Sequence, residues 1–116
     1  MKAEDARRIA LALPEAIEAP HFHYASFRVR GKIFATLPPE GTHLHVFVSQ
    51  AEREPALAMD AEFLEPLPWG KRIVGLRVTL ARARPAVVRQ LLRSAWQAKA
   101  PRSLQRAGDE SAAGEQ

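Results

Sequence analysis

The sequence predicts one α+β domain, in which helices pack against an antiparallel sheet. Three observations favour this class. The chain has 116 residues, of which 47% are apolar and 26% charged, the balance of a single soluble domain. Apolar residues recur at helical spacing near both ends of the chain. Between these ends, several segments alternate apolar and polar residues, as half-buried strands do.

The first half of the chain is expected to form one helix and three strands. Apolar residues recur every three or four positions from Ala6 to Leu13, and Pro14 ends this helix. Three alternating segments follow a short connection, and Gly31 and residues 38–41 supply the turns between them. Such short links predict an antiparallel meander. The expected bounds are 3–13 for the helix, 15–20 for the connection, and 24–30, 32–37 and 42–49 for the strands.

The second half is expected to add two helices and one clear strand. Ser49, with a glutamate three residues later, is a capping-box pattern that opens a helix to about residue 59, with Pro55 inside it. Residues 65–70 carry two prolines and a glycine, which predict an irregular connection before an alternating strand at 72–80. Pro85 suits the first turn of a last helix that extends to about residue 98. The apolar stripe of this helix consists of Val88, Leu91, Leu92, Ala95 and Trp96.

The register of the first hairpin decides which side chains face the core. A three-residue loop would place Ile33 opposite Val29 and keep both apolar sets on one face. A two-residue turn would instead pair Val29 with Lys32 and bring Phe34 beside Phe27. The longer loop hides more apolar surface from water, so it is the expected register. The face opposite the core would then carry Ser26, Arg28, Phe34, Thr36, His43, His45 and Phe47, with Arg77 as a further candidate.

Positive charge is concentrated in one part of the chain. The net charge is +4, yet residues 1–65 hold seven basic and ten acidic side chains. Residues 66–108 hold ten basic side chains and no acidic one. Such a stretch attracts polyanions if its cations share one surface, and it is an ordinary arginine-rich helix surface if they do not. The sequence leaves both interpretations open.

Several classes of site find no support in the sequence. The chain has no cysteine, which excludes disulfides, zinc–thiolate sites and thiol catalysis and fits a reducing cytoplasm. The pairs His21/His23 and His43/His45 lack a third metal ligand nearby, so we expect no metal and no other cofactor. There is neither a Gly-x-Ser-x-Gly elbow nor a glycine-rich phosphate loop. We therefore expect a cytoplasmic binding protein rather than an enzyme.

We also expect no association with membranes and a disordered C-terminal tail. No apolar run approaches the roughly 20 residues that a membrane helix needs. Residues 107–116 are small, polar and acidic, which predicts disorder. The expected organisation is therefore a single domain at 1–106 followed by a disordered acidic tail at 107–116.

Two features suit nucleic acid but have ordinary explanations as well. Arg30 and Lys32 flank a glycine at a hairpin tip, where they either contact phosphates or are merely hydrated turn residues. Trp69 and Trp96 are candidates for base stacking, although a lone tryptophan in such places is more often part of the core. Basic and aromatic groups on one sheet face suit phosphates and stacked bases, and they suit a covered face equally.

Several segments of the chain resemble the MmcQ/YjbR family of small bacterial proteins. The most specific is Gly31-Lys32-Ile33-Phe34-Ala35, within the stretch 26–37. The resemblance covers roughly residues 5–104 and departs at His23, where glycine is common, at Trp96, where tyrosine is usual, and along His43–His45. The other matching segments are Ala12-Leu13-Pro14, His21-Phe22, Pro68-Trp69-Gly70, Leu91–Trp96 and Ala100-Pro101-Arg102.

This resemblance implies a two-layer α-β(3)-α-β(2)-α fold, with an antiparallel sheet and helices on one side, similar to secretion chaperones. It also implies a short fourth strand around Phe63-Leu64 or just before Trp69. The family is commonly described as binding DNA through a double wing, a description that rests on structural analogy.

The expected function is therefore binding of DNA, mainly through non-specific phosphate contacts. The alternative is a protein-interaction module that resembles secretion chaperones and binds no nucleic acid. The expected contact residues are Arg28, Arg30 and Lys32 in one wing, Lys71, Arg72 and Arg77 at the second, and Arg89 and Arg93 beside them.

Overall fold

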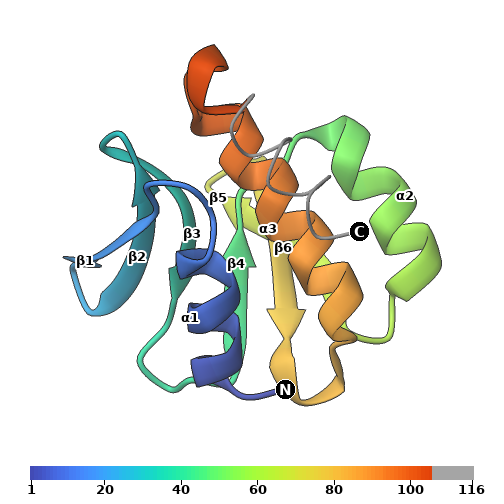
Figure 1. Ribbon diagram of the computed structural model, residues 1–116. Helices are drawn as coiled ribbons and strands as arrows, with labels where there is room; N and C mark the ends of the chain where they lie inside the picture. Colours follow the sequence, from blue (N-terminus) through green and yellow to red (C-terminus); the bar gives the residue numbers. More distant parts are fainter. Residues whose placement is uncertain (106–116) are drawn as a thin grey trace.

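A six-stranded antiparallel sheet forms one layer of the fold, and three helices lie on one side of it (Figure 1). The computed structural model describes residues 1–105, so the tail expected at 107–116 lies outside the described residues. The strands are ordered β1-β2-β3-β4-β6-β5 across the sheet. The elements are α1 (Ala3–Leu11), β1 (Ile17–His21), β2 (Tyr24–Val29), β3 (Lys32–Leu37), β4 (His43–Val46), α2 (Gln50–Asp60), β5 (Leu64–Trp69), β6 (Arg72–Thr79), the 3-10 turn η1 (Leu80–Arg82) and α3 (Pro85–Lys99).

The expected α+β class is confirmed, with one strand more than the family resemblance implies. Strands β2, β3 and β4 form the predicted meander. Strand β6 follows the predicted alternation from Leu76 to Val78, but a bulge at Val74 interrupts it before that, and Val74 does not face the core as expected. Helix α3 buries all five residues of its predicted stripe. Helix α2 begins after Ser49, but this side chain makes no capping hydrogen bond. Instead, Arg53 Nη1 donates to the carbonyl oxygen of Val48 at 2.7 Å.

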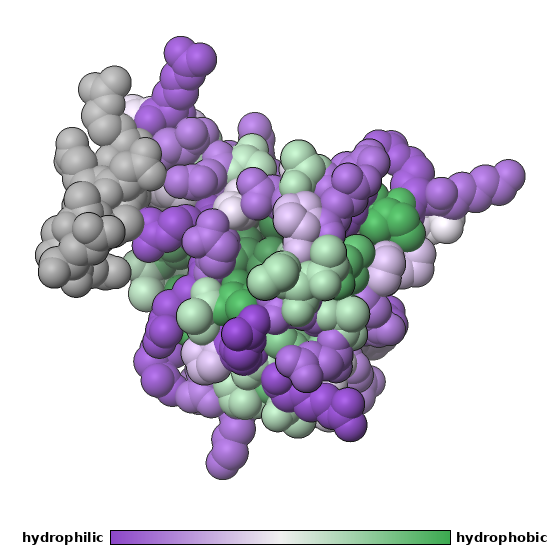
Figure 2. Space-filling model, turned by 90° about the vertical axis from the view of Figure 1, so that its right-hand side faces the viewer, coloured by the Kyte–Doolittle hydropathy of each residue, from purple (hydrophilic) through white to green (hydrophobic). Residues whose placement is uncertain are grey.

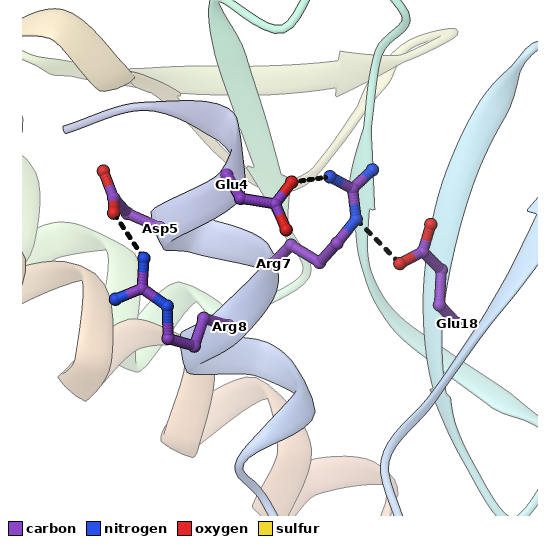
Figure 3. A network of polar contacts seen from close by, with 5 residues as sticks. All are labelled: Glu4, Asp5, Arg7, Arg8 and Glu18. Atoms are coloured by element: carbon purple, nitrogen blue, oxygen red, sulfur yellow. Dashed lines mark hydrogen bonds and ion pairs between the residues drawn. The ribbon is translucent and has the colours of Figure 1, made fainter.

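Strand β1 shows that the connection expected at 15–20 is wrong. It pairs with β2 along its whole length and forms one edge of the sheet. Arg7 of α1 holds it in place, since it donates to Glu4 in its own helix at 2.7 Å and to Glu18 of β1 at 2.8 Å (Figure 3). The strand is mostly exposed and contains Pro20, which an edge strand tolerates.

Strand β5 shows that the connection expected at 65–70 is also wrong, and it is the further strand that the family resemblance implies. It pairs with β6 from Leu64 opposite Val78 to Trp69 opposite Arg72. Because β5 forms the other edge of the sheet, its two prolines cost few ladder hydrogen bonds.

The first hairpin has the shorter turn, not the expected three-residue loop. Val29 lies opposite Lys32, and both turn residues have positive φ, 49° for Arg30 and 80° for Gly31. The expected register assumed regular strands, whereas a bulge leaves Phe34 without a partner on β2. Phe34 is therefore fully buried in the core rather than on the open face.

The core lies between the sheet and the helices, and it contains one of the two tryptophans. Trp96 of α3 is fully buried, and its indole nitrogen donates to the carbonyl oxygen of Pro14 at 3.0 Å. Trp69, by contrast, is 77% exposed at the end of β5, so the core interpretation is wrong for this residue. Phe27 and Phe34 are fully buried in the same core.

The side of the molecule on which α2 lies carries hydrophobic residues in its middle, with hydrophilic side chains around them (Figure 2). Met59 near the end of α2 is 78% exposed. Among residues 1–105, no helix has the length and apolar character needed to cross a bilayer.

Candidate functional site

The face of the sheet opposite the helices is hollowed into a groove of about 840 Å³. Thr36 of β3, His45 of β4 and Arg77 of β6 lie in its floor as successive cross-strand partners. Thr36 is 3% exposed and His45 is 8% exposed, although no helix covers them. The burial comes from neighbouring side chains, since Tyr24 and Arg77 lie against His45. Polar groups form the floor of the groove.

Arg77 is held in a fixed position by its neighbours on the floor. Its Nη1 donates to Glu65 Oε1 at 3.1 Å, and its Nε faces His45 Nε2 at 3.4 Å. Burial lowers the pKa of His45, and the positive charge of Arg77 lowers it further. The neutral imidazole can then accept the hydrogen bond from the guanidinium.

Four cations line the groove, and two of them are free to meet an anion. Arg53 donates to a backbone carbonyl and Arg77 is paired with a carboxylate. Arg72 at the start of β6 and Lys99 at the end of α3 have no carboxylate partner within residues 1–105. Positive charge at the groove is thus available mainly where Arg72 and Lys99 lie.

Aromatic side chains line the same groove. Trp69 lies directly opposite Arg72 across the β5–β6 turn, so the two side chains leave the same face of the hairpin. Phe47 follows β4, and Tyr24 of β2 packs edge-on against His45, with ring centroids 5.9 Å apart. The site therefore combines cations with aromatic faces.

Two hairpin tips point to the same end of the sheet. Strands β2 and β5 run in the same direction, because each successive neighbour in the sheet is antiparallel. The turn at 30–31 and the turn at 70–71 therefore project from the same end of the sheet. However, Arg30 at the first tip is paired with Glu15, whereas Lys71 and Arg72 at the second have no described acidic partner.

The predicted contact residues fall into separate groups. Arg72 and Arg77 line the groove, and Lys71 adjoins it at the second turn. Arg28 lies toward the other edge, where it donates to Ser26 Oγ at 2.9 Å and to the Pro20 carbonyl oxygen at 3.3 Å.

The remaining predicted residues lie away from the groove. Arg30 and Lys32 lie at the first hairpin tip. Arg89 and Arg93 belong to α3, and Arg89 precedes Lys99 by ten helical residues, or about 15 Å along the axis.

Sequence reasoning missed Arg53 and Lys99 as groove residues. Both lie on helices, and their closeness to the open face depends on where α2 begins and where α3 ends. No local sequence pattern indicates that either residue lies at the groove.

Comparison with known proteins agrees with the fold. The family model described as YjbR matches residues 11–98. The chain belongs to the YjbR family. The crystal structure of the Deinococcus radiodurans protein DR2400, which carries the domain DUF419, superposes with a TM-score of 0.70 at 17% identity. The match covers 93% of this chain and 85% of that one, and it shows a shared fold. No curated protein matches the chain.

Within residues 1–105, the two histidine pairs of this YjbR chain do not form a metal site. His43 Nδ1 lies 2.9 Å from Thr42 Oγ1, and His45 faces Arg77. Within residues 1–105, no three histidine, aspartate or glutamate side chains come together in a way that could hold a metal ion.

Proposed function

We propose that this YjbR protein binds nucleic acid at the groove, as a binding protein without catalysis. The observation that carries the proposal is that an exposed tryptophan lies beside cations that have no carboxylate partner within residues 1–105. Arg72 and Lys99 line the groove together with Trp69, which is 77% exposed. Cations neutralise phosphates and aromatic faces stack on bases, so the two together suit a nucleic acid.

The β5–β6 hairpin carries most of the expected contacts. Lys71 and Arg72 are consecutive at its turn, and neither has a carboxylate partner among residues 1–105. At the first hairpin, Glu15 neutralises Arg30. The proposal therefore assigns the second wing a larger share than the sequence predicts, with Lys32 as a minor contributor.

Binding is expected to tolerate different sequences. Base-specific readout relies on bidentate contacts from arginine, asparagine or glutamine to base edges. The chain contains no asparagine, and no glutamine among residues 1–105 lines the groove. Arg77 is already engaged by Glu65 and His45. Phosphate contacts and base stacking therefore contribute most of the binding free energy, and both depend little on nucleotide sequence.

A salt titration with mixed-sequence oligonucleotides, single-stranded and double-stranded, tests the proposal. If Lys71, Arg72 and Lys99 neutralise about three phosphates, log affinity falls against log salt with a slope of about −2 to −3. The double variant Arg72→Ala/Lys99→Ala is expected to make the slope shallower by about 1.5–2. Arg82→Ala/Arg89→Ala, which also removes two cations but away from the groove, is the matched control and should leave the slope unchanged. No binding of either probe at low salt would reject the proposal.

A further inference from the structure

The groove offers more than a surface for phosphates, because exposed aromatic side chains line it and these stack on a base whose face is free. We infer, resting on the nucleic-acid function proposed above, that the groove takes unpaired nucleotides and that the protein selects single-stranded over double-stranded nucleic acid.

Trp69 and Arg72 together can hold one nucleotide by its base and its phosphate. They are direct cross-strand partners on one face of the hairpin, where such side chains have Cβ atoms about 5 Å apart. A base stacked on the exposed indole would place its own phosphate within reach of the guanidinium. Arg72 has no carboxylate partner within residues 1–105, and Trp69 is 77% exposed, so both are available to a ligand.

A second aromatic face lies at the floor of the groove. Thr36 and His45 in the floor are almost completely buried, so they offer a ligand little surface. The ring of Tyr24, which packs edge-on against His45 and is 39% exposed, is open to an unpaired base. The volume of about 840 Å³ falls within the range of sites that enclose organic ligands.

A duplex cannot use either feature. Its bases are stacked on one another and paired, so their faces are closed to Trp69. Its backbone would meet the rim cations alone, among which Arg72 and Lys99 are unpaired within residues 1–105. A single strand gains the same phosphate contacts and adds stacking, and its bases can be splayed into the groove.

The test compares the affinities of a mixed-sequence single strand of about 15 nucleotides and of its blunt duplex, by fluorescence anisotropy at low salt. We expect the single strand to bind at least about fivefold more tightly, and Trp69→Ala to weaken it by roughly 5- to 150-fold, the range for loss of one stacked base. The duplex affinity should change less than twofold, and Trp69→Phe should restore most of the selectivity.

The control is Met59→Ala, which removes an equally exposed apolar side chain from α2. It should leave both affinities unchanged. Equal or tighter binding of the duplex, or an equal loss for both probes in Trp69→Ala, would overturn this inference while the nucleic-acid function stands. Failure of both probes to bind would instead remove the proposed function and this inference with it.

Discussion

Arg30 and Glu15 form a two-pronged ion pair, in which Nε and Nη2 of the arginine donate to the two carboxylate oxygens at 2.7 and 2.9 Å. The pair links the β2–β3 turn to the segment between α1 and β1, and both residues have positive φ, 49° and 56°. The hydrogen bonds from Arg30 lower the pKa of Glu15, so the carboxylate stays charged. The first hairpin tip thus presents an arginine whose charge is already neutralised.

Removing this carboxylate should therefore increase affinity. Glu15→Gln leaves Arg30 free to contact a phosphate, so binding of a mixed-sequence oligonucleotide should tighten and its salt slope should steepen by up to about 1. Glu40→Gln makes the same change of charge in the β3–β4 turn, which lies at the other end of the sheet. Anisotropy titrations of both variants provide the comparison. Equal effects would show that only net charge matters.

The two tryptophans should differ sharply in their contribution to stability. Trp96→Ala leaves a cavity in the core and removes the hydrogen bond to the Pro14 carbonyl oxygen, so the free energy of unfolding should fall by about 3–5 kcal/mol. Trp69→Ala removes an exposed side chain and should change it by less than about 0.5 kcal/mol. Urea denaturation measures both. A large loss in Trp69→Ala would mean that its side chain supports the fold.

Gly75 should tolerate no side chain. A Cβ at this position in β6 would lie 2.1 Å from the carbonyl oxygen of Val46 in β4, a backbone atom that cannot move aside. We expect Gly75→Ala to reduce the free energy of unfolding by about 3 kcal/mol. Gly31→Ala meets open space and is strained only by its positive φ, so about 1 kcal/mol is expected. The account of this strand contact fails if Gly75→Ala is the milder change in denaturation.

Stability should fall in mild acid because of His45. Burial and the charge of Arg77 lower its pKa in the folded state, whereas the unfolded state keeps the ordinary value of about 6.5. Below that pH, His45 binds a proton in the unfolded chain but stays largely neutral in the folded chain. The free energy of unfolding should then fall by up to about 1.4 kcal/mol per pH unit. His45→Gln should flatten the profile between pH 7 and 5.5, and an unchanged profile would contradict this role.

The sequence predicts the interior strands and helices of this fold well, because their burial leaves a periodic pattern. In β6, Leu76 and Val78 are buried while Arg77 between them is not, and α3 carries an apolar stripe, since each has one face in the core. The two strands that sequence reasoning missed, β1 and β5, are the two edges of the sheet. Edge strands bury little and admit proline, so β1 and β5 resemble loops in sequence.

The candidate site could be predicted only in part, for a related reason. Arg72 and Arg77 were found because charge is visible in a sequence. The ion pair between Arg30 and Glu15 joins residues from two separate turns, so no local sequence pattern predicts it. The exposure of Trp69 depends on its place at the end of an edge strand, and the closeness of Lys99 depends on how α3 crosses the sheet.

Backbone and indole NMR shifts on addition of a single-stranded oligonucleotide test the central claim most directly. The account predicts that the indole N–H of Trp69 and the amides of Arg72 and Lys99 shift in a saturable, salt-sensitive manner. The indole N–H of Trp96, bonded to Pro14 inside the core, should stay in place and serves as the internal reference. Shifts confined to α1, α2 or the first hairpin, or no shift at low salt, would contradict binding at this groove.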